Sequence, residues 1–346
     1  MRPASSWIEA TMESLNYRNA SAPRVAANTK EQAAEVSAVD QTVGVLRAYF
    51  SQRPDMHCLV VIDPSRLGFP ESLEQKIPVF EQPHAIVTIA HEAFPDEHRP
   101  YLVELNLSTP DGVELLAESV RLAFEDRHPD SVAQGLGQRV GGWLASNGSA
   151  DVVAAHWSQQ ILQTDNRGRQ CALRFYDSRA LSLLWSMLSP GQRQALLGPV
   201  SAWHALDACG KPCIYTSTDT SLADLTLTDA QWQATHRHGL VNRALGLHMQ
   251  AMERQPDPQE VEAAVASAAR AEQYGLSDRD DIIAFIGHAL AWHPQFDRYP
   301  KVTLALQQRE PDDFYTATVN ELSPDEIEEI RRGNWVNEKS LSSAAR

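Results

Sequence analysis

The chain has 346 residues, of which 43% are hydrophobic and 22% charged, as in an ordinary folded protein. Its 45 acidic residues outnumber the 30 Lys and Arg residues, for a formal net charge of −15. This balance argues against a nucleic acid or an anionic membrane surface as the partner, because both repel negative charge.

The chain also lacks the sequence marks of export or of a membrane. Four cysteines are too few for a disulfide scaffold at this length. The amino-terminal residues have no continuous apolar segment typical of a secretory signal. No run approaches the roughly 20 apolar residues that a membrane-spanning helix needs. We therefore expect a cytoplasmic protein.

The first part of the chain predicts a segment without a packed core, followed by alternating strands and helices. Residues 1–38 are polar, and we expect them to be poorly ordered or loosely docked. A first core helix is predicted from Val39 to Phe50, and a buried strand from Met56 to Ile62. Further strands are expected at 85–90, 101–107 and 160–164, and helices at 111–124 and 151–160.

The stretch from Gln170 to Leu188 combines both kinds of pattern. Residues 171–176 alternate between apolar and polar, as in a half-buried strand, and residues 181–188 place an apolar face on a helix. Asp177 is placed to cap this helix. Asn166-Arg167-Gly168 predicts a hairpin turn into the strand, and Ser189-Pro190 predicts the start of the next helix.

The remaining residues predict a hairpin around 209–212 and then helices only. Thr228-Asp229 starts a long helix to about Met252, and capping patterns begin others at Ser277, with Asp280, and at Ser323. We therefore expect an α/β domain at 39–225, with a mixed sheet and flanking helices, followed by an all-α lobe at 226–346.

Several patterns suggest a metal or nucleotide site only weakly. His91-Glu92 and His98 have the wrong spacing for a zinc peptidase helix, and Pro95 interrupts any such helix. A zinc site from His204, Cys209 and Cys213, with His236 or His238, is less favoured than a plain hairpin. Four glycines at 135, 137, 141 and 142 do not form a phosphate-binding loop. We expect no cofactor and no metal.

The polar residues around Asp177 favour a structural role over catalysis. Asp63, Glu104 and Asp177 lie near predicted strand ends, where a hydrolase could use two of them as acid and base. We prefer Asp177 as a helix cap and Asp63 as a turn former. Arg179 is expected to clamp Asp177 or neighbouring carbonyl groups, whereas Arg174 is expected to point away from the sheet.

A cluster of acidic residues near the carboxyl end is a candidate binding surface. The expected final helix gathers the carboxylates of Glu321, Asp325, Glu326, Glu328 and Glu329. A solvated helix face is the simpler interpretation. The alternative is a surface that attracts a positively charged partner.

The segment RFYDSRALSLLWSMLSPGQRQALLGPV resembles the signature of the effector-chaperone (adaptor) family of bacterial type VI secretion systems. The resemblance covers roughly Leu59 to Val241, and VVIDPSR and PYLVEL resemble upstream family segments in the same order. Ser178 stands where proline is usual, and Leu196-Leu197 where aromatic residues are common. The family positions that match include Arg174, Phe175, Tyr176, Asp177, Arg179, Gly198 and Pro199.

The resemblance implies a non-catalytic adaptor that holds a toxic effector and loads it onto the VgrG spike. An α/β platform with a second lobe and without a cofactor suits such a role. The alternatives are a hydrolase whose carboxylates converge in the folded chain, and a structural subunit of the secretion apparatus.

Overall fold

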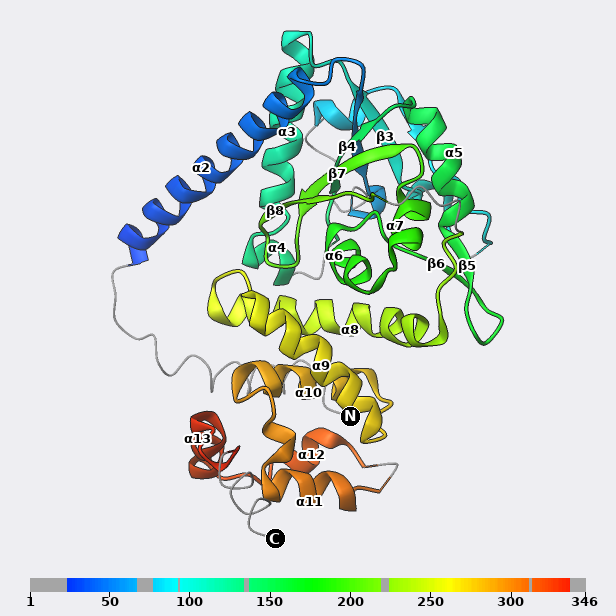
Figure 1. Ribbon diagram of the computed structural model, residues 1–346. Coiled ribbons are helices and arrows are strands. Elements are labelled where there is room, and N and C mark those ends of the chain that lie inside the picture. The colour runs from blue at the N-terminus through cyan, green and yellow to red at the C-terminus, as the bar shows by residue number, and fades with distance from the viewer. Residues whose placement is uncertain are drawn as a thin grey trace. The chain divides into compact units, whose positions relative to one another are not determined.

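The computed structural model describes residues 24–66, 77–92, 94–133, 137–218, 224–310 and 313–336. It divides into two compact units (Figure 1). Within the described residues, the sheet unit comprises 24–235 and the helical unit comprises 236–336. The expected order, a lobe of sheet and helices followed by an all-helical lobe, is confirmed.

A six-stranded sheet forms the centre of the sheet unit, in the order β2-β3-β1-β4-β7-β8. All described strand pairs are antiparallel, where a mixed sheet was expected. The strands are β1 (His57–Ile62), β2 (His84–Ile86), β3 (Tyr101–Leu105), β4 (Val140–Ser146), β7 (Val200–Leu206) and β8 (Pro212–Tyr215). A separate hairpin pairs β5 (Leu162–Thr164) with β6 (Gln170–Ala172).

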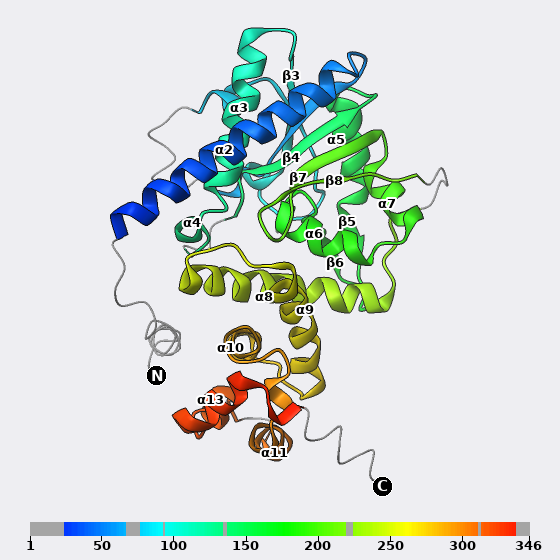
Figure 2. The same ribbon diagram turned by 60° about the vertical axis from the view of Figure 1, so that its left-hand side comes forward.

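Helices cover both faces of this sheet (Figures 1 and 2). On one face α2 (Arg24–Ser51) and α3 (Pro110–Glu125) pack over a core that includes Val60 and Ile62. On the other face Leu59 and Val61 join a core with α5 (Ala150–Gln160), α6 (Ser178–Met187) and α7 (Pro190–Leu197). Alternate residues of β1 therefore serve two cores, which explains its nearly continuous apolar sequence.

Short helical turns connect the larger elements of the sheet unit. They are α4 (Pro129–Ala133) and the 3₁₀ turns at Pro64–Arg66, Pro78–Glu81 and Asp96–His98. Two predictions in this unit need correction. The first helix begins at Arg24 rather than Val39, so residues 24–38 are helical, while residues 1–23 lie outside the described chain. The strand predicted through Phe175 ends at Ala172, because the chain turns into the core at that point.

The helical unit is built from consecutive helices around an aromatic core. They are α8 (Asp229–Met252, which begins within the sheet unit), α9 (Pro258–Gln273), α10 (Arg279–Ala291), α11 (Pro300–Gln308), α12 (Tyr315–Val319) and α13 (Pro324–Arg332), with a 3₁₀ turn at Phe296–Arg298. Phe285 packs against Phe296 and Tyr315, with ring centroids 4.8 and 5.4 Å away. The predicted cap of α13 at Ser323 is confirmed, whereas α10 is capped by Asp278 rather than Ser277.

No helix in the described part of the chain has both the length and the apolar character that crossing a membrane requires.

A buried histidine in the helical unit predicts a dependence of stability on pH. The ring of His288 stacks on Trp292, its Nδ1 atom lies 2.7 Å from the Tyr315 hydroxyl, and burial lowers its pKa to about 3. The unfolded chain, with a pKa near 6.5, takes up a proton first as the pH falls. We therefore expect the free energy of unfolding to decrease by about 2 kcal/mol between pH 7 and pH 5 from this residue alone.

Chemical denaturation of the wild type and of His288→Asn at pH 7 and pH 5 measures the contribution of His288 to this loss of stability. The variant is expected to be less stable at pH 7 and to lose less stability on acidification. An equal loss in both proteins would contradict the prediction.

Candidate functional site

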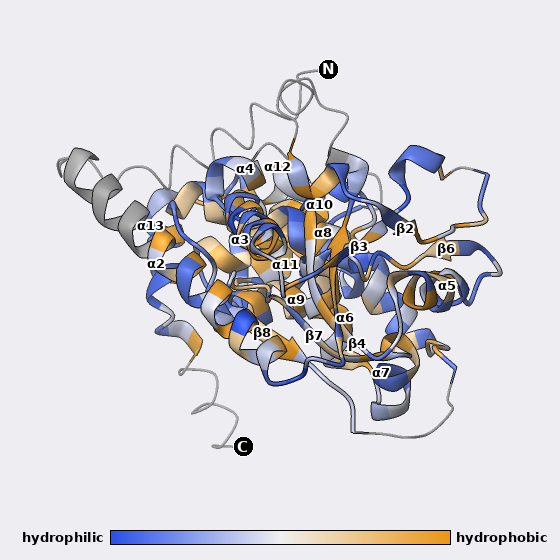
Figure 3. Ribbon diagram, turned by 90° about the horizontal axis from the view of Figure 1, so that it is seen from above, coloured by the Kyte–Doolittle hydropathy of each residue, from blue (hydrophilic) through white to orange (hydrophobic). Residues whose placement is uncertain are grey.

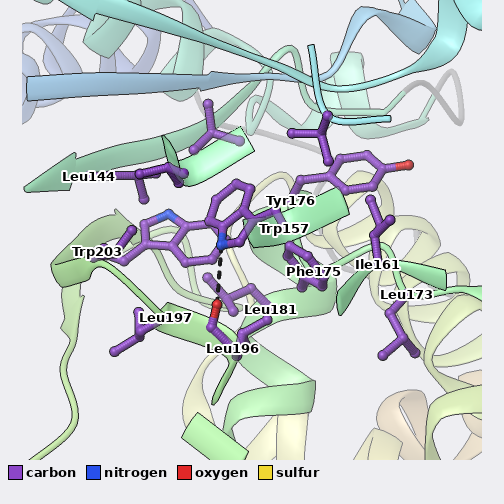
Figure 4. Close-up of a cluster of buried hydrophobic side chains, with 14 of the residues drawn as sticks. Leu144, Trp157, Ile161, Leu173, Phe175, Tyr176, Leu181, Leu196, Leu197 and Trp203 are labelled. Atoms are coloured by element: carbon purple, nitrogen blue, oxygen red, sulfur yellow. Dashed lines mark hydrogen bonds between the residues drawn. The ribbon is translucent and has the colours of Figure 1, made fainter. Parts of the chain in front are cut away.

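The family-like segment begins in a turn between β6 and α6, which we call the motif turn (Leu173–Asp177). The backbone N–H of Asp177 donates to the Arg174 carbonyl at 3.1 Å, which closes the turn. Phe175 and Tyr176 enter the core and are at most 1% exposed. Figure 4 shows them beside Trp157 and Trp203, and the Trp157 ring lies edge-on to Phe175 at 5.2 Å. Burial of these rings accounts for the aromatic pair in the motif.

Asp177 combines helix capping with an ion pair to Arg179. Its carboxylate accepts from the Arg179 backbone N–H at 3.0 Å, from Nε at 3.1 Å and from Nη2 at 2.7 Å. Burial alone would raise the pKa of Asp177, but the Arg179 guanidinium and these bonds, with Arg174, lower it to about 2. The carboxylate therefore remains ionised at neutral pH and acts as a clamp.

Arg174 connects the motif turn to the end of the central strand. Its Nη2 atom donates to Asp63 Oδ2 at 2.7 Å, and its guanidinium carbon lies 5.5 Å from the centre of the Tyr176 ring. Asp63 is fully buried and also accepts from the Ser65 backbone N–H. Arg174 is about half exposed. The pair joins residues 111 positions apart in the sequence and fixes the turn on β1.

Two further arginines extend this charged cluster to α3 and to the β7–β8 hairpin. Arg139, just before β4, donates through Nε to Asp126 Oδ1 at 2.8 Å. Arg127 donates to the Asp207 carbonyl at 2.6 Å, and burial together with Arg179 lowers the pKa of Arg127 to about 10. Sequence reasoning missed both contacts, because nothing local in the sequence marks which distant group an arginine will reach.

The motif turn also packs directly on β4 at a glycine. A Cβ atom at Gly141 would lie 2.0 Å from the Tyr176 carbonyl oxygen and 2.9 Å from a methyl group of Val61. Both neighbours belong to well-packed parts of the sheet unit, so neither has room to move. Gly141 therefore allows the backbone of the motif turn to touch the sheet.

Replacing Gly141 with alanine is expected to destabilise the sheet unit by about 1–3 kcal/mol through overpacking. Gly44→Ala in α2 is the matched control, because a Cβ atom there meets nothing within 4 Å. That control is expected to stabilise the chain by up to about 1 kcal/mol, since alanine favours a helix. Urea denaturation measures the free energy of unfolding of both variants. Equal changes in the two variants would show that the close contact at Gly141 does not cause the destabilisation.

Gly198 and Pro199 form the corner between α7 and β7. Gly198 has a φ of +57°, and a Cβ atom there would lie 2.2 Å from the His156 ring. The Pro199 carbonyl accepts from the Ser146 hydroxyl at 3.2 Å. Both residues therefore have a structural role in positioning the corner.

The carboxylates considered for a hydrolase all have structural partners, and Asp63 and Asp177 both interact with Arg174. Asp63 and Asp177 are each held by an arginine of the motif. Glu104 lies opposite Leu59, toward the other end of β1. There its carboxylate contacts His57 Nδ1 at 2.7 Å and accepts from the Ala150 backbone N–H at the start of α5.

The weaker metal candidates are also dispersed in the described part of the chain. His204, Cys209 and Cys213 do not form a group of converging ligand atoms there. The Cys213 thiol contacts the Ala205 carbonyl at 3.4 Å, and His204 is buried against Tyr49. His98 ends a 3₁₀ turn rather than a helix shared with His91. Gly135 of the glycine group lies outside the described residues.

Several carboxylates of the acidic cluster bind within the helical unit. Glu326 completes the capping box of α13 by accepting from the Ser323 backbone N–H, and it contacts Lys301 Nζ at 3.0 Å. Glu329 accepts from the Tyr299 hydroxyl at 2.8 Å. Glu328 lies 3.8 Å from Arg331. Glu321 and Asp325 are exposed. Glu329 is also exposed but is held by Tyr299, so Glu321 and Asp325 are the exposed members whose carboxylates remain available to attract a basic partner.

The part of the chain that matches a known family includes the motif turn. A family model described as "Domain of unknown function (DUF4123)" matches residues 89–195, less than a third of the chain. This family is associated with adaptors of type VI secretion effectors. The match contains Arg174 to Arg179 and ends within α7. Neither the comparison with curated proteins nor that with solved structures found a match.

Proposed function

We propose that the chain is a non-catalytic cytoplasmic adaptor that binds a toxic type VI effector and loads it onto the VgrG spike. The family match over residues 89–195 is the observation that carries this proposal. The motif residues support it as parts of a rigid platform, because their charges are used in contacts within the sheet unit. Such a platform needs neither a cofactor nor an active site.

Co-purification with the products of the neighbouring genes tests the proposal. The full-length chain is tagged, expressed with those genes, and washed at moderate salt. We expect one toxin-like protein to remain bound, and the spike protein to be recovered only when that toxin is present. Purification of the chain alone under all conditions would reject the adaptor role. Stable incorporation into the assembled apparatus would instead favour a structural subunit.

The exposed acidic residues of the helical unit provide a second measurement on the same complex. If they attract a basic region of the effector, Glu321→Lys with Asp325→Lys should weaken binding, and the loss should shrink at high salt. Asp151→Lys, an exposed change on α5, is the matched control. Equal binding by both variants would show that the acidic cluster is only a solvated surface.

A further inference from the structure

Strand β8, at the end of the sheet, carries exposed side chains on one of its faces. Cys213 and Tyr215 point into the core beneath α5, α6 and α7. The alternate side chains, Pro212, Ile214 and then Thr216, are exposed, and Ile214 is 53% exposed. Figure 3 shows hydrophobic colour on β8 at this edge of the sheet. The helical layer of α2 and α3 therefore stops before it reaches β8.

Helix α2 borders this face of β8. The Tyr49 ring packs on the His204 ring of β7 at 4.5 Å, and His204 is the register partner of Ile214. Val45 lies one helical turn before Tyr49 on the same side of α2 and is also 53% exposed. Val45 is thus the neighbour of Tyr49 along α2, and Ile214 is the neighbour of His204 across the sheet. We call the surface formed by Val45, Tyr49, Pro212, Ile214 and Thr216 the β8 shelf.

The shape of the shelf favours a helix over an added strand. Strand β8 has only four residues and begins with a proline, which has no N–H group to donate. Lys211 precedes it. Short length, proline and lysine are features that protect a sheet edge from pairing. A helix packs about 8–10 Å from its neighbour, so one placed beside α2 would lie over β8 and cover both exposed apolar side chains.

Two cationic side chains, Arg53 and Lys211, border the shelf, and the Asp207 carboxylate near Lys211 accepts from the Lys211 backbone N–H at 2.9 Å. The Arg53 guanidinium lies 4.0 Å from the centre of the Tyr49 ring and donates to the Tyr49 carbonyl. Lys211 is exposed at the other border. No contact of either cation with a carboxylate is seen among the described residues. A helix with carboxylates beside its apolar stripe complements this surface.

We propose that the β8 shelf binds an amphipathic helix of the partner protein. Its apolar stripe covers Val45 and Ile214, and its acidic side chains face Arg53 and Lys211. The identification of that partner as the effector rests on the adaptor function proposed above.

Binding of the co-purified effector to variants of the full-length chain tests the shelf. Ile214→Glu and Val45→Glu are each expected to raise the Kd at least about tenfold, because they place a charge in the apolar contact. Ile86→Glu on the opposite edge strand and Val152→Glu on α5 are matched controls, since both residues are 52% exposed. They should leave the Kd within about twofold. Unchanged melting temperatures would show that all four variants fold.

A photo-crosslinking residue at position 214 identifies the occupant. Crosslinks to effector residues spaced three or four apart would support the helix, whereas crosslinks to alternate residues would indicate strand addition and overturn it. Crosslinks between two copies of this chain would also overturn it. A complex as tight with Ile214→Glu as with Ile86→Glu would reject the shelf alone. Failure of the unmodified chain to bind any neighbouring product would reject the adaptor function and the shelf together.

Discussion

Replacing Asp177 with alanine is expected to lower the free energy of unfolding of the sheet unit by about 3–5 kcal/mol, because the change leaves the buried Arg179 without its carboxylate. The same change removes the cap of α6. Ser189→Ala is the matched control in this unit, since it removes the cap of the neighbouring helix α7 without exposing a charge. That control should cost only about 1 kcal/mol.

Urea denaturation of both variants separates the cap from the ion pair. Equal losses would show that the pair with Arg179 adds nothing beyond capping. Acid titration gives an independent check, because the folded pKa of Asp177, about 2, lies below the unfolded value near 3.9. Its stabilisation is therefore complete above that unfolded value and is lost as the pH falls toward 2, so the variant should show a weaker acid dependence in this range.

Replacing Trp157 is expected to cause the second large loss of stability, because this side chain joins the motif turn to two helices and the sheet. Its ring is fully buried, lies 4.8 Å from the Trp203 ring, and donates through Nε1 to the Leu196 carbonyl at 3.1 Å (Figure 4). Trp157→Ala is expected to cost about 3–5 kcal/mol through the cavity that it leaves.

Two further variants identify the source of that loss. Val152→Ala on the same helix, where the side chain is 52% exposed, should change stability by less than about 0.5 kcal/mol. Trp157→Phe keeps most of the apolar volume but removes the indole donor, so it should fall between the two. Denaturation followed by far-ultraviolet circular dichroism measures all three. A loss for Trp157→Ala no greater than that for Val152→Ala would contradict the packing described here.

Local patterns in the sequence predicted most elements of the sheet unit. Asp177 was predicted to cap α6 because a short side chain with an oxygen acceptor, placed just before an apolar helical face, can accept from the free N–H groups of the first turn. The structure confirms this cap. The hairpin at 166–168 was predicted equally well, because the chain needs a residue with positive φ there and Gly168 has a φ of +77°. These features depend on neighbours only a few residues away.

Features that depend on distant parts of the chain were predicted poorly. The alternation of residues 171–176 suggested a strand through Phe175, yet the core draws Phe175 and Tyr176 into a turn against β4. The partner of Arg174 was also missed, since Asp63 had been interpreted as a turn former, with a catalytic role as the alternative. The purely antiparallel pairing of the strands was also missed, and a mixed sheet was expected. An alternation of strands and helices along the chain does not by itself specify whether strands pair parallel or antiparallel.

The long sequence separation between Asp63 and Arg174 has a consequence for synthesis on the ribosome. The residues of the sheet from β1 to β8 all lie before Thr216, and the described residues of the helical unit follow them. The ion pair cannot form until the motif turn leaves the exit tunnel. More than a hundred further codons must therefore be translated after Asp63 before Arg174 can pair with it. After β8 has emerged, the sheet can close while the helices beyond it are still being translated. A ribosome stalled late in α8 should therefore already display a folded sheet.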